Sequence, residues 1–451
     1  MGECVGPRLR SWNLLAASCA GACGWEAEGR SGGGVRVLLL THYFPPEIGA
    51  PQRRWRELVA GFTGAGHQVA VCAPVPHYPH RSATALKAAN TKTMKWGDGQ
   101  NGERVLRVPY LPTSSSMPGQ LLDQSVSSLF AFRVAAAMRR DAPDVVISTT
   151  PGIPMLFAGD SVARYLGIPH VAEIRDAWPD LIADSHLVRT ATRSVLPEQV
   201  NSYLEQKALP AVFHAALRRA SRIVVTTDGF RTRLAGCGHS AVTVVRNTAV
   251  PYRPSKQENQ RASRDSLRLL YVGTVGRSQG LESIVRVVGA VPGVHLKIVG
   301  AGAAHRGLQR SAAEVLARTD DLTGGGRIQF LPQTTGDELE SLWRWADSGV
   351  VSLTGLPSFE YTVPSKLYTL MARGVHITGV LSGEAAQIVT DAGAGHVVSP
   401  GDIDGLHDLL IDLRDGAADL TPSPRAQDWL ATHAAPEIAL GAYLDVLEGV
   451  R

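Results

Sequence analysis

Short, uninterrupted apolar runs recur along most of this chain, and segments long enough for a helix separate them. Val35–Thr41 and Gln68–Ala73 are the first two runs, with a helical pattern over Gln52–Phe62 between them. Apolar strands without polar alternation are typical of parallel sheets, because helices cover both faces of such sheets. The pattern therefore predicts a βαβ unit at the start of an α/β fold.

The apolar runs form two series. Residues 144–148, 169–173 and 222–226 extend the first series. The runs of the second series are Leu267–Gly273, His295–Gly300, Ile328–Leu331, Gly349–Ser352 and Val375–Val380. A chain of 451 residues is too long for one ordinary core, so two series of strands indicate two domains.

We predict two Rossmann-like, doubly wound domains that face a cleft. The N-terminal domain is expected over 35–250 and the C-terminal domain over 267–425. The polar stretch 251–266, which is rich in chain-breaking residues, is interpreted as the linker between them. Residues 426–451 are predicted to form an amphipathic helix that is able to pack back on the N-terminal domain.

Residues 1–34 do not share this pattern. Arg8 and Arg10 precede the short apolar run 14–22, which imitates a weak secretion signal, and a glycine-rich stretch follows. We interpret 1–34 as a disordered or misassigned extension, which we favour over an export signal. Since no apolar run reaches the roughly 20 residues that a spanning helix needs, we expect a cytoplasmic protein, at most peripheral at the inner membrane face.

Charge and cysteine usage exclude some classes of protein. The formal net charge of +4, with only 19% charged residues and no run of Lys and Arg, gives little support for a nucleic-acid partner. The five cysteines show no spacing that is typical of a zinc site or a disulfide framework. Anionic small molecules or a membrane surface suit the mildly basic charge better.

The stretch LPSFEYTVPSKLYTLMARG, at 356–374, carries the most specific chemical signal. Glu360 is predicted to lie in a loop, and a helix is predicted to begin near Ser365, with Ser365 as its cap. The backbone amides of a helix start favour an anion, and Lys366 adds a positive charge there. A carboxylate for hydroxyl groups beside a basic helix start suits a nucleotide-sugar site. The alternative is an ordinary capped helix with a surface lysine.

Glycines follow two strands of the second series, where open α/β sheets bind ligands. Gly273 and Gly276 precede Arg277, which is able to neutralise a phosphate, and Gly300 and Gly302 follow the next strand. Neither loop completes GxGxxG, so we discount a dinucleotide cofactor. Plain turns explain each loop equally well.

The first domain has corresponding positions for contacts to a sugar or its acceptor. The Phe44–Gly49 loop, with Arg53 after it, follows the first strand, and Arg175 and Asp176 follow the apolar strand at 169–172. Gly49, Arg53 and Arg175 are candidates for acceptor contacts. Asp176 is a catalytic candidate, together with Glu360, Arg277 and Lys366, and like Arg175 it could contact the sugar or its acceptor. A structural Arg175–Asp176 pair that fixes a loop is the alternative.

Two less regular segments also invite an assignment. Residues 77–130 hold several aromatic side chains and histidines, and 185–219 form an amphipathic stretch with several arginines. Either segment could recognise an acceptor or contact a membrane surface. Packing against the sheet of the first domain is the interpretation that we favour for both.

Taken together, the motifs of this chain resemble those of the retaining glycosyltransferases of family 4, which have the two-domain GT-B fold. The subgroup that it is most similar to includes the WbuB-like enzymes of surface-polysaccharide synthesis. The matching pieces occur in the family's order over about 35–445; they are THYFPPEIGAPQRR, AGHQVAV, EIRDAWPD, VTTDGFRTRL, YVGTVGRSQGLESI, LKIVGAG, FEYTVPSKLYTLMARG and GHVVSPGDIDGL.

The resemblance assigns roles to several residues of this chain. Glu360 is nearest to the glutamate that binds the hydroxyls of the donor sugar, although counting back along the motif gives Tyr361. The slot of a second glutamate, which holds the ribose, reads Thr369. A basic pair usually grips the diphosphate; its slots hold Thr274 and Gln279 here. The resemblance therefore implies that Arg277 and Lys366 supply that charge instead.

The same resemblance implies the reaction. A hexosyl or N-acetylhexosaminyl group would move from a nucleotide sugar, UDP-linked in our expectation, to a glycan or lipid-linked acceptor with retained anomeric configuration. The departing phosphate can take the acceptor's proton, and the protein stabilises charge and orients the reactants, so neither cofactor nor metal is expected. The formal DxD at Asp402–Asp404 is interpreted as a helix cap rather than a metal site.

Two other functions remain open from the sequence. A nucleotide-sugar epimerase of similar fold would use carboxylates as acid and base and would need no acceptor. A non-catalytic nucleotide-sugar-binding partner subunit is the second alternative. Thr369 and Gln279 support this second alternative, because they replace residues that the family uses.

Overall fold

The computed structural model describes residues 23, 25, 34–77, 93–111, 117–192, 195–250, 266–317 and 327–451. Two compact units make up these residues. The first unit extends to Thr226 and also includes Phe230–Val245 and Ala439–Arg451; the second includes Thr227–Gly229 and Arg246–Ile438. Nearly all of the predicted extension 1–34 and linker 251–266 lies outside the described residues.

An eight-stranded sheet forms the centre of the described part of the first unit, in the order β3-β4-β2-β1-β5-β6-β7-β8. Its strands are β1 (Arg36–Leu40), β2 (Gln68–Pro74), β3 (Trp96–Asp98), β4 (Arg104–Val108), β5 (Val145–Thr149), β6 (His170–Ile174), β7 (Arg222–Val225) and β8 (Val242–Val244). The strands pair in parallel except β3, which is antiparallel to β4. The parallel strands predicted from the first series of apolar runs are confirmed.

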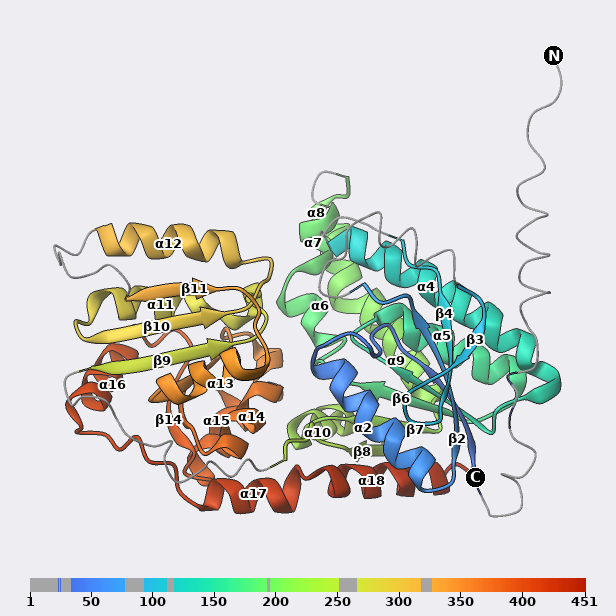
Figure 1. Cartoon of the computed structure of the whole chain (residues 1–451). Coiled ribbons are helices and arrows are strands. Elements are labelled where there is room, and N and C mark those ends of the chain that lie inside the picture. The colour runs from blue at the N-terminus through green and yellow to red at the C-terminus, as the bar shows by residue number, and fades with distance from the viewer. Residues whose placement is uncertain are drawn as a thin grey trace. The chain divides into compact units, whose positions relative to one another are not determined.

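Helices cover both faces of this sheet (Figure 1). They are α2 (Ala50–Gly64), α4 (Met117–Ala137), α5 (Ile153–Leu166), α6 (Asp180–Asp184), α7 (Leu187–Thr192), α8 (Glu198–Tyr203), α9 (Leu209–Arg219) and α10 (Asp228–Gly236), with a 3₁₀ turn η2 (Met138–Asp141) and a π-helical segment η3 (Leu204–Ala208). The side chains of a strand alternate between the two faces. Val37 and Leu39 therefore pack toward α2, and Leu38 and Leu40 pack toward α4 and α5.

The last helix of the chain, α18 (Pro436–Glu448), completes the core of the first unit. Tyr443 on α18 is fully buried, and its ring lies 5.9 Å from Trp55 and 5.4 Å from Phe62 of α2, centroid to centroid. Its hydroxyl donates to Oε2 of the buried Glu173 at 3.1 Å. Arg54, at 3.2 Å, and the hydroxyl of Thr149, at 3.0 Å, also contact Glu173, so this buried carboxylate is satisfied within the core.

The described residues of the second unit contain a six-stranded parallel sheet in the order β11-β10-β9-β12-β13-β14. Its strands are β9 (Leu267–Val272), β10 (Val294–Val299), β11 (Ile328–Leu331), β12 (Ser348–Ser352), β13 (His376–Val380) and β14 (Gly395–Val398). Its helices are α11 (Leu281–Ala290), α12 (His305–Ala317), α13 (Gly336–Trp345), α14 (Ser365–Arg373), α15 (Gly383–Asp391), α16 (Ile403–Asp415) and α17 (Arg425–His433), with 3₁₀ turns η4 (Arg277–Gln279) and η5 (Pro357–Phe359). The second predicted strand series is also confirmed.

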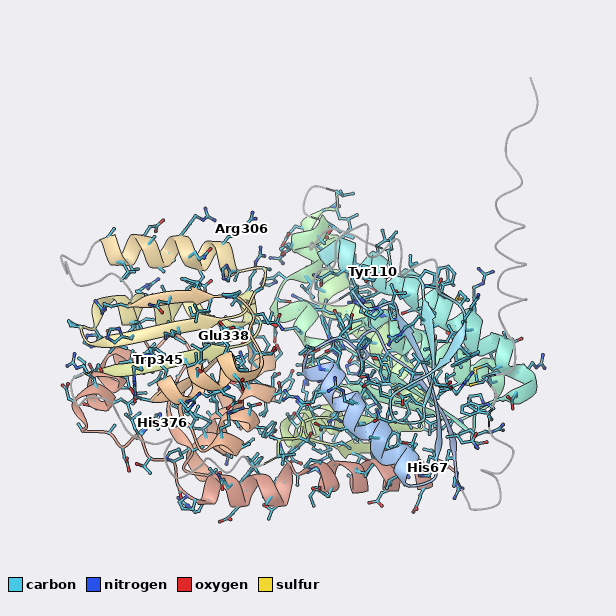
Figure 2. All side chains as sticks on the ribbon, viewed as in Figure 1. His67, Tyr110, Arg306, Glu338, Trp345 and His376 are labelled. Carbon is cyan, nitrogen blue, oxygen red and sulfur yellow. The ribbon has the colours of Figure 1, made fainter. Side chains whose placement is uncertain are left out.

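The core of the second unit is mainly aliphatic. On one face of the sheet, Leu269, Leu296 and Ile298 pack with the buried residues of α11, α12 and α16. The other face carries Leu270 and Val299, which pack with Leu342 of α13. Figure 2 shows all described side chains, including Trp345 at the end of α13 and His376 at the start of β13.

Two predictions about helices are wrong. The single C-terminal helix is in fact α17 and α18, because the helix ends at His433 and Pro436, which is favoured in the first turn, begins another. Ser365 is not the cap of α14: Pro364 holds the cap position, Ser365 is the first helical residue, and no side chain caps this helix. Asp402 does cap α16, since its carboxylate accepts from Gly405 N at 2.8 Å, as predicted.

Segment 77–130 contains more regular structure than the sequence indicates. Strands β3 and β4 and the start of α4 lie in it, while 78–92 and 112–116 fall outside the described residues. Among the residues that are described, no helix combines the length and the apolar character that a membrane crossing requires.

Candidate donor site in the second unit

The glycine loops after β9 and β10 pack against each other. A Cβ atom at Gly300 would overlap the carbonyl oxygen of Gly273, and one at Gly302 would overlap that of Val275. Val275 N also donates to Ala301 O at 2.9 Å. Gly300 has a φ of +136°, which side chains rarely adopt. The predicted glycines Gly300 and Gly302 therefore have a structural role, which is to bring two loops together at the carboxyl edge of the sheet.

Lys366 lies beside the first of these loops. It is the second residue of α14, and a Cβ placed on Gly273 would lie 3.5 Å from its Nζ. The ammonium donates to the hydroxyl of Tyr271 at 2.6 Å and to Oε1 of Gln279 at 2.7 Å. It also lies 3.9 Å from the centroid of the Tyr271 ring. Strand β9, turn η4 and helix α14 thus converge on one cation.

The electrostatic state of Lys366 is unusual for a lysine. Its described partners are a phenol and an amide, and no carboxylate in the described part of the chain forms an ion pair with it. Burial lowers the pKa of Lys366 from 10.5 to about 7. Removing an ammonium from water disfavours its charged form, and an anion placed beside it would reverse that effect.

Turn η4 brings Gln279 into contact with Lys366 and also carries Arg277. Gln279 is held by its side chain, which contacts Lys366 and the Tyr271 hydroxyl, and by its carbonyl, which accepts from Ser352 Oγ at 2.6 Å. Arg277, two residues earlier on the same turn, is exposed, and Gly276 precedes it. The structure thus brings Gly273, Gly276, Gln279 and Lys366 together around one loop, with Arg277 on its exposed side.

Glu360, Ser365 and Thr369 differ in which of their polar groups are open to a ligand. Glu360 follows η5 and is exposed, and its carbonyl accepts from Glu384 N at 2.7 Å, which fixes the loop. The hydroxyl of Thr369 donates to Ser365 O at 3.3 Å, within α14. The helix start at Ser365 carries no capping side chain, so its first amides have none of the partners that caps supply.

In the first unit, the predicted site residues lie at the start of α2 and directly after β6. Gly49 precedes α2, Arg53 N donates to Gly49 O at 3.0 Å, and the Arg53 side chain is exposed. The guanidinium of Arg175 is nearly buried and lies 3.8 Å from Glu173, rather than pairing with its neighbour as the structural alternative supposed. Burial raises the pKa of Asp176.

Tyr271 is the site residue that the sequence analysis missed. It lies on β9 and is fully buried in the core of the second unit, yet its hydroxyl donates to Thr274 O at 2.6 Å and accepts from Lys366. A tyrosine in a strand that is aliphatic apart from Arg268, two residues before a glycine loop, is the signal that could have indicated it, because buried tyrosine hydroxyls usually need a partner.

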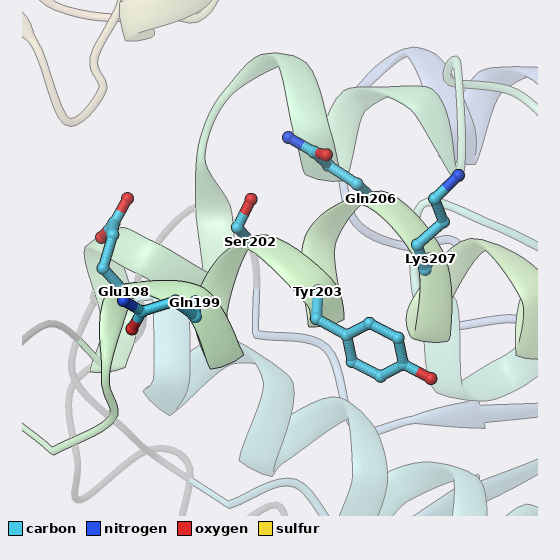
Figure 3. Close-up of a pocket in the computed structure, with 6 residues that line it drawn as sticks. All are labelled: Glu198, Gln199, Ser202, Tyr203, Gln206 and Lys207. Carbon is cyan, nitrogen blue, oxygen red and sulfur yellow. The ribbon is translucent and has the colours of Figure 1, made fainter.

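A surface hollow lies elsewhere, along α8 and η3 of the first unit (Figure 3). Its lining consists of Glu198, Gln199, Ser202, Tyr203, Gln206 and Lys207. All six belong to one continuous helical stretch, and none is a predicted site residue. It is therefore a feature distinct from the Lys366 site.

The comparisons with known proteins agree with this fold. Residues 49–252 match the model of the glycosyl transferase 4-like domain. A putative colanic acid biosynthesis glycosyl transferase of Escherichia coli K12, WcaI, is 22% identical over 374 residues, which cover 78% of this chain and 84% of the relative.

Solved structures with the same fold include three at low sequence identity. Sucrose-phosphate synthase of Thermosynechococcus elongatus has a TM-score of 0.65 at 15% identity, covering 92% of this chain and 98% of its own. Anabaena HepE in complex with UDP and glucose has a TM-score of 0.60 at 15% identity, with 92% and 99% covered. WaaG, a glycosyltransferase of lipopolysaccharide biosynthesis, has a TM-score of 0.56 at 14% identity, with 90% and 98% covered.

The fold is therefore that of the GT-B glycosyltransferases. The matched domain and the E. coli relative indicate a glycosyltransferase, and the chain is similar to those of family 4.

Proposed function

We propose that this chain transfers a sugar from a nucleotide-sugar donor, UDP-linked, to a glycan or lipid-linked acceptor in the synthesis of cell-surface polysaccharide, and that Lys366 binds the donor's diphosphate. The observation that carries the proposal is the position of the Lys366 ammonium at the carboxyl edge of the second sheet, 2.7 Å from Gln279 and with its pKa lowered to about 7. A half-buried cation of this kind suits an anionic ligand.

The leaving group explains why such a cation is needed. Negative charge develops on the diphosphate as the bond to the sugar breaks, so a fixed positive charge lowers the barrier. Lys366 would supply this charge from within the site, and Arg277 and the first amides of α14 would add to it from its rim. Glu360, exposed after η5, would accept hydrogen bonds from the hydroxyls of the donor sugar.

Gly273 and Gly276 would let the diphosphate approach the backbone, and Gln279 would orient the lysine.

We propose further that the configuration of the sugar is retained, with the departing phosphate oxygen taking the proton of the acceptor hydroxyl. The residues would then stabilise charge and position the reactants, and no metal or other cofactor takes part in this proposal. Asp176, whose pKa burial raises, would contact sugar or acceptor from the first unit together with Arg175.

The names of related proteins support the choice of donor and product. HepE was solved with UDP and glucose, and the E. coli relative is named for colanic acid biosynthesis. A UDP-hexose donor and a polysaccharide product are therefore the first pair to test.

One observation favours a second function, a non-catalytic nucleotide-sugar-binding subunit. The Thr369 hydroxyl is bonded to Ser365 O, so the position that resembles the family's ribose-binding glutamate presents no carboxylate. A subunit of this kind would bind a nucleotide sugar without transferring or hydrolysing it.

A thermal-shift screen of the full chain against nucleotides and nucleotide sugars tests the donor, and transfer from the best ligand to a panel of glycan and lipid-linked acceptors then tests the reaction. A UDP-hexose that raises the melting temperature and is consumed with an acceptor supports the transferase. Binding without consumption favours the partner subunit, and turnover of the sugar without acceptor favours an epimerase. Failure of every nucleotide to bind would refute the site.

For the acceptor side, we propose contact with a membrane surface through the first unit. Exposed apolar side chains occur on α4, at Leu122 and Leu129, and on the 185–219 stretch, at Tyr203 and Val212. Lys207 adds positive charge on the second of these elements. Co-sedimentation with anionic vesicles tests this: Leu122→Ser with Leu129→Ser should reduce binding, and equal binding would refute the contact.

A further inference from the structure

The loop that carries Glu360 is fixed through its backbone by a neighbouring helix of the second unit. Gly383 and Glu384 are the first residues of α15, and Glu384 N donates to Glu360 O at 2.7 Å. Gly383 has a φ of +57°, and a Cβ atom placed on it would overlap the carbonyl of Glu360. The backbone of Glu360 therefore rests directly on the first turn of α15, with no room for a side chain between them.

The carboxylate of Glu384 binds a second segment, Thr227–Gly229, which belongs to the same unit. Its Oε2 accepts from Gly229 N at 2.6 Å, and its Oε1 accepts from Asp228 N at 3.2 Å. These two amides lie in the first turn of α10, where N–H groups find no acceptor within the helix itself. The carboxylate that takes them up thus caps α10 from another helix, 156 residues further along the chain.

Arg246 completes the polar cluster around Glu384. Its Nη1 donates to Glu384 Oε1 at 2.7 Å, and its Nη2 pairs with the carboxylate of Asp228. The guanidinium also lies 5.4 Å from the centroid of the Trp429 ring. The side chains of Arg246 and Glu384 are only 10% and 14% exposed, so solvent screens this pair much less than it screens a surface ion pair. Removal of one partner would leave the other charge nearly buried and unbalanced.

The segment that Glu384 holds in turn contacts the residue after Glu360. Thr227 Oγ1 donates to Tyr361 O at 2.7 Å. A Cβ atom at Gly229 would lie 2.8 Å from Cβ of Tyr361, so the segment and the loop are in close contact there. Glu384 N and Thr227 Oγ1 thus bind two successive carbonyls of one loop, and the Glu384 carboxylate holds the segment from which Thr227 reaches that loop.

Glu360 depends on these contacts because its own side chain is exposed. Burial does not hold the carboxylate in place, so its position follows from the backbone that carries it. A hydrogen bond between a carboxylate and a hydroxyl group requires a heavy-atom distance of about 2.5–3.0 Å. A shift of about 1 Å in the loop would therefore take the carboxylate out of reach of a sugar hydroxyl, and misplacements of this size weaken catalysis strongly.

We propose that Glu384 is a positioning residue for the donor sugar. Its carboxylate holds the Thr227–Gly229 segment, its amide and Thr227 hold the loop, and the loop presents Glu360 to the hydroxyls of the sugar. Glu384 acts only through Glu360 and touches neither the sugar nor the diphosphate. The inference rests on the proposed transferase function, since it needs Glu360 to bind the donor sugar, but it does not involve the Lys366 contact to the diphosphate.

Two substitutions alter different parts of this arrangement. Glu384→Gln keeps the shape of the side chain and the backbone bond to Glu360, but it removes the charge that Arg246 and the two helix amides face. Thr227→Val keeps the branched side chain and removes only the hydroxyl that donates to Tyr361 O. Both variants should loosen the loop and leave its sequence unchanged.

Glu340→Gln, on α13 of the same unit, is the matched control. The Glu340 carboxylate accepts from Arg373 Nη1 at 2.8 Å, so this variant also removes one charge from a carboxylate–arginine pair. A further comparison combines Glu384→Gln with Glu360→Ala, because a double-mutant cycle shows whether one residue acts through another. If Glu384 acts through Glu360, the double variant should bind the sugar no more weakly than Glu360→Ala alone.

Isothermal titration calorimetry measures binding of UDP-glucose and of UDP to the full chain. We expect Glu384→Gln and Thr227→Val each to weaken UDP-glucose binding about threefold to tenfold, the range for loss of one hydrogen bond, and to leave UDP binding unchanged. Glu340→Gln should bind both ligands like the wild type. In the Glu360→Ala background, Glu384→Gln should change UDP-glucose binding by less than about twofold. A purely structural role would instead weaken both ligands alike or neither.

The outcomes separate this inference from the donor site. Unchanged UDP-glucose binding in either variant, an equal loss for UDP and UDP-glucose, or a full additional loss in the Glu360→Ala background would each overturn the positioning role. A wild type that binds UDP but not UDP-glucose would overturn it as well, and in all of these cases the Lys366 site stands. A wild type that binds neither ligand would refute the donor site and this inference with it. If Glu384→Gln lacks a cooperative melting transition, Thr227→Val is measured alone and in the Glu360→Ala background, with the same expectations.

Discussion

The ammonium of Lys366 lies 2.7 Å from Oε1 of Gln279, although 87 residues separate them in the chain. Gln279 stands in a slot that, by resemblance, holds a basic residue of the diphosphate grip. A positive charge therefore reaches this position from the start of α14 rather than from the glycine loop. This relocation suggests that the two positions can be tested as a pair.

Exchanging the two side chains tests the relocation. Lys366→Gln should weaken binding of UDP-glucose about tenfold or more, because the diphosphate loses its fixed cation. Adding Gln279→Lys should restore most of that affinity, since the ammonium then arises from the other side of the same contact. Isothermal titration calorimetry measures the affinity of each variant for UDP-glucose. A double variant that binds UDP-glucose as weakly as Lys366→Gln alone would show that the two positions are not equivalent.

The pH dependence of donor binding should report the titration of Lys366. Its pKa of about 7 means that the ammonium is largely formed below pH 7 and increasingly neutral above it. Because an anion binds the charged form, the Kd for UDP-glucose should be nearly constant below pH 7 and should rise up to about tenfold per unit above it. UDP-glucose is the suitable probe, since its phosphates do not titrate in this range. The rise should be absent in Lys366→Gln, and an equal rise in both proteins would contradict the assignment.

Glu360→Ala should lower turnover by tens-fold or more, because a contact to the donor sugar is lost in a site built on electrostatics. The side chain is exposed, so the melting temperature should stay within experimental error of the wild type. Glu338→Ala, on an exposed residue of α13, is the control and should keep normal turnover. Steady-state kinetics with the nucleotide sugar that the thermal-shift screen selects measure both, and near-normal rates in Glu360→Ala would remove Glu360 from the site.

Gly300→Ala should destabilise the second unit. The residue has a φ of +136°, and its Cβ would overlap the carbonyl of Gly273, so either loop must shift. We expect a loss of about 1–3 kcal/mol in the free energy of unfolding. Gly307→Ala, on α12 with nothing within 4 Å of its Cβ, should instead be neutral or stabilising by about 0.5–1 kcal/mol. Urea unfolding compares the two, and equal stabilities would refute the tight loop contact.

Acid should destabilise the second unit through His376. Mainly through burial, the pKa of His376 is lowered to about 3 in the folded chain, whereas the pKa of a histidine in the unfolded chain is 6.5. The unfolded chain therefore binds a proton below pH 6.5 that the folded chain does not, and stability falls by about 1.4 kcal/mol per pH unit between 6 and 4. His376→Asn keeps a group near Ser348 Oγ but cannot titrate, so its unfolding free energy should fall less steeply with acid. Parallel curves for the two proteins would show that His376 does not contribute.

The strands could be predicted because apolar runs such as Val35–Thr41 must be buried on both faces of a sheet, a local property of the sequence. Lys366 could be indicated as well, since proline, serine and lysine at a helix start form a local motif. The break before Pro436 was visible in the sequence, but continuous apolar spacing on both sides of it outweighed the proline.

The remaining features depend on tertiary contacts that no local pattern contains. Tyr271 reaches Lys366 across 95 residues, and the glycine loops are defined by their packing against each other. Glu384 and Gly229 come from α15 and α10, and no spacing in the sequence brings those two together. Only the fold determines which polar residues share the edge of a sheet.

The claim that Lys366 holds the donor's diphosphate is tested most directly by titrating UDP and uridine, at pH 6.5, into the wild type, Lys366→Ala and Lys297→Ala. Lys297 lies in the same unit, 4.0 Å over the Trp345 ring, and serves as the control lysine. The claim predicts that Lys366→Ala binds UDP at least about tenfold more weakly and uridine unchanged, while Lys297→Ala binds both normally. Equal affinity of Lys366→Ala and wild type for UDP would contradict it.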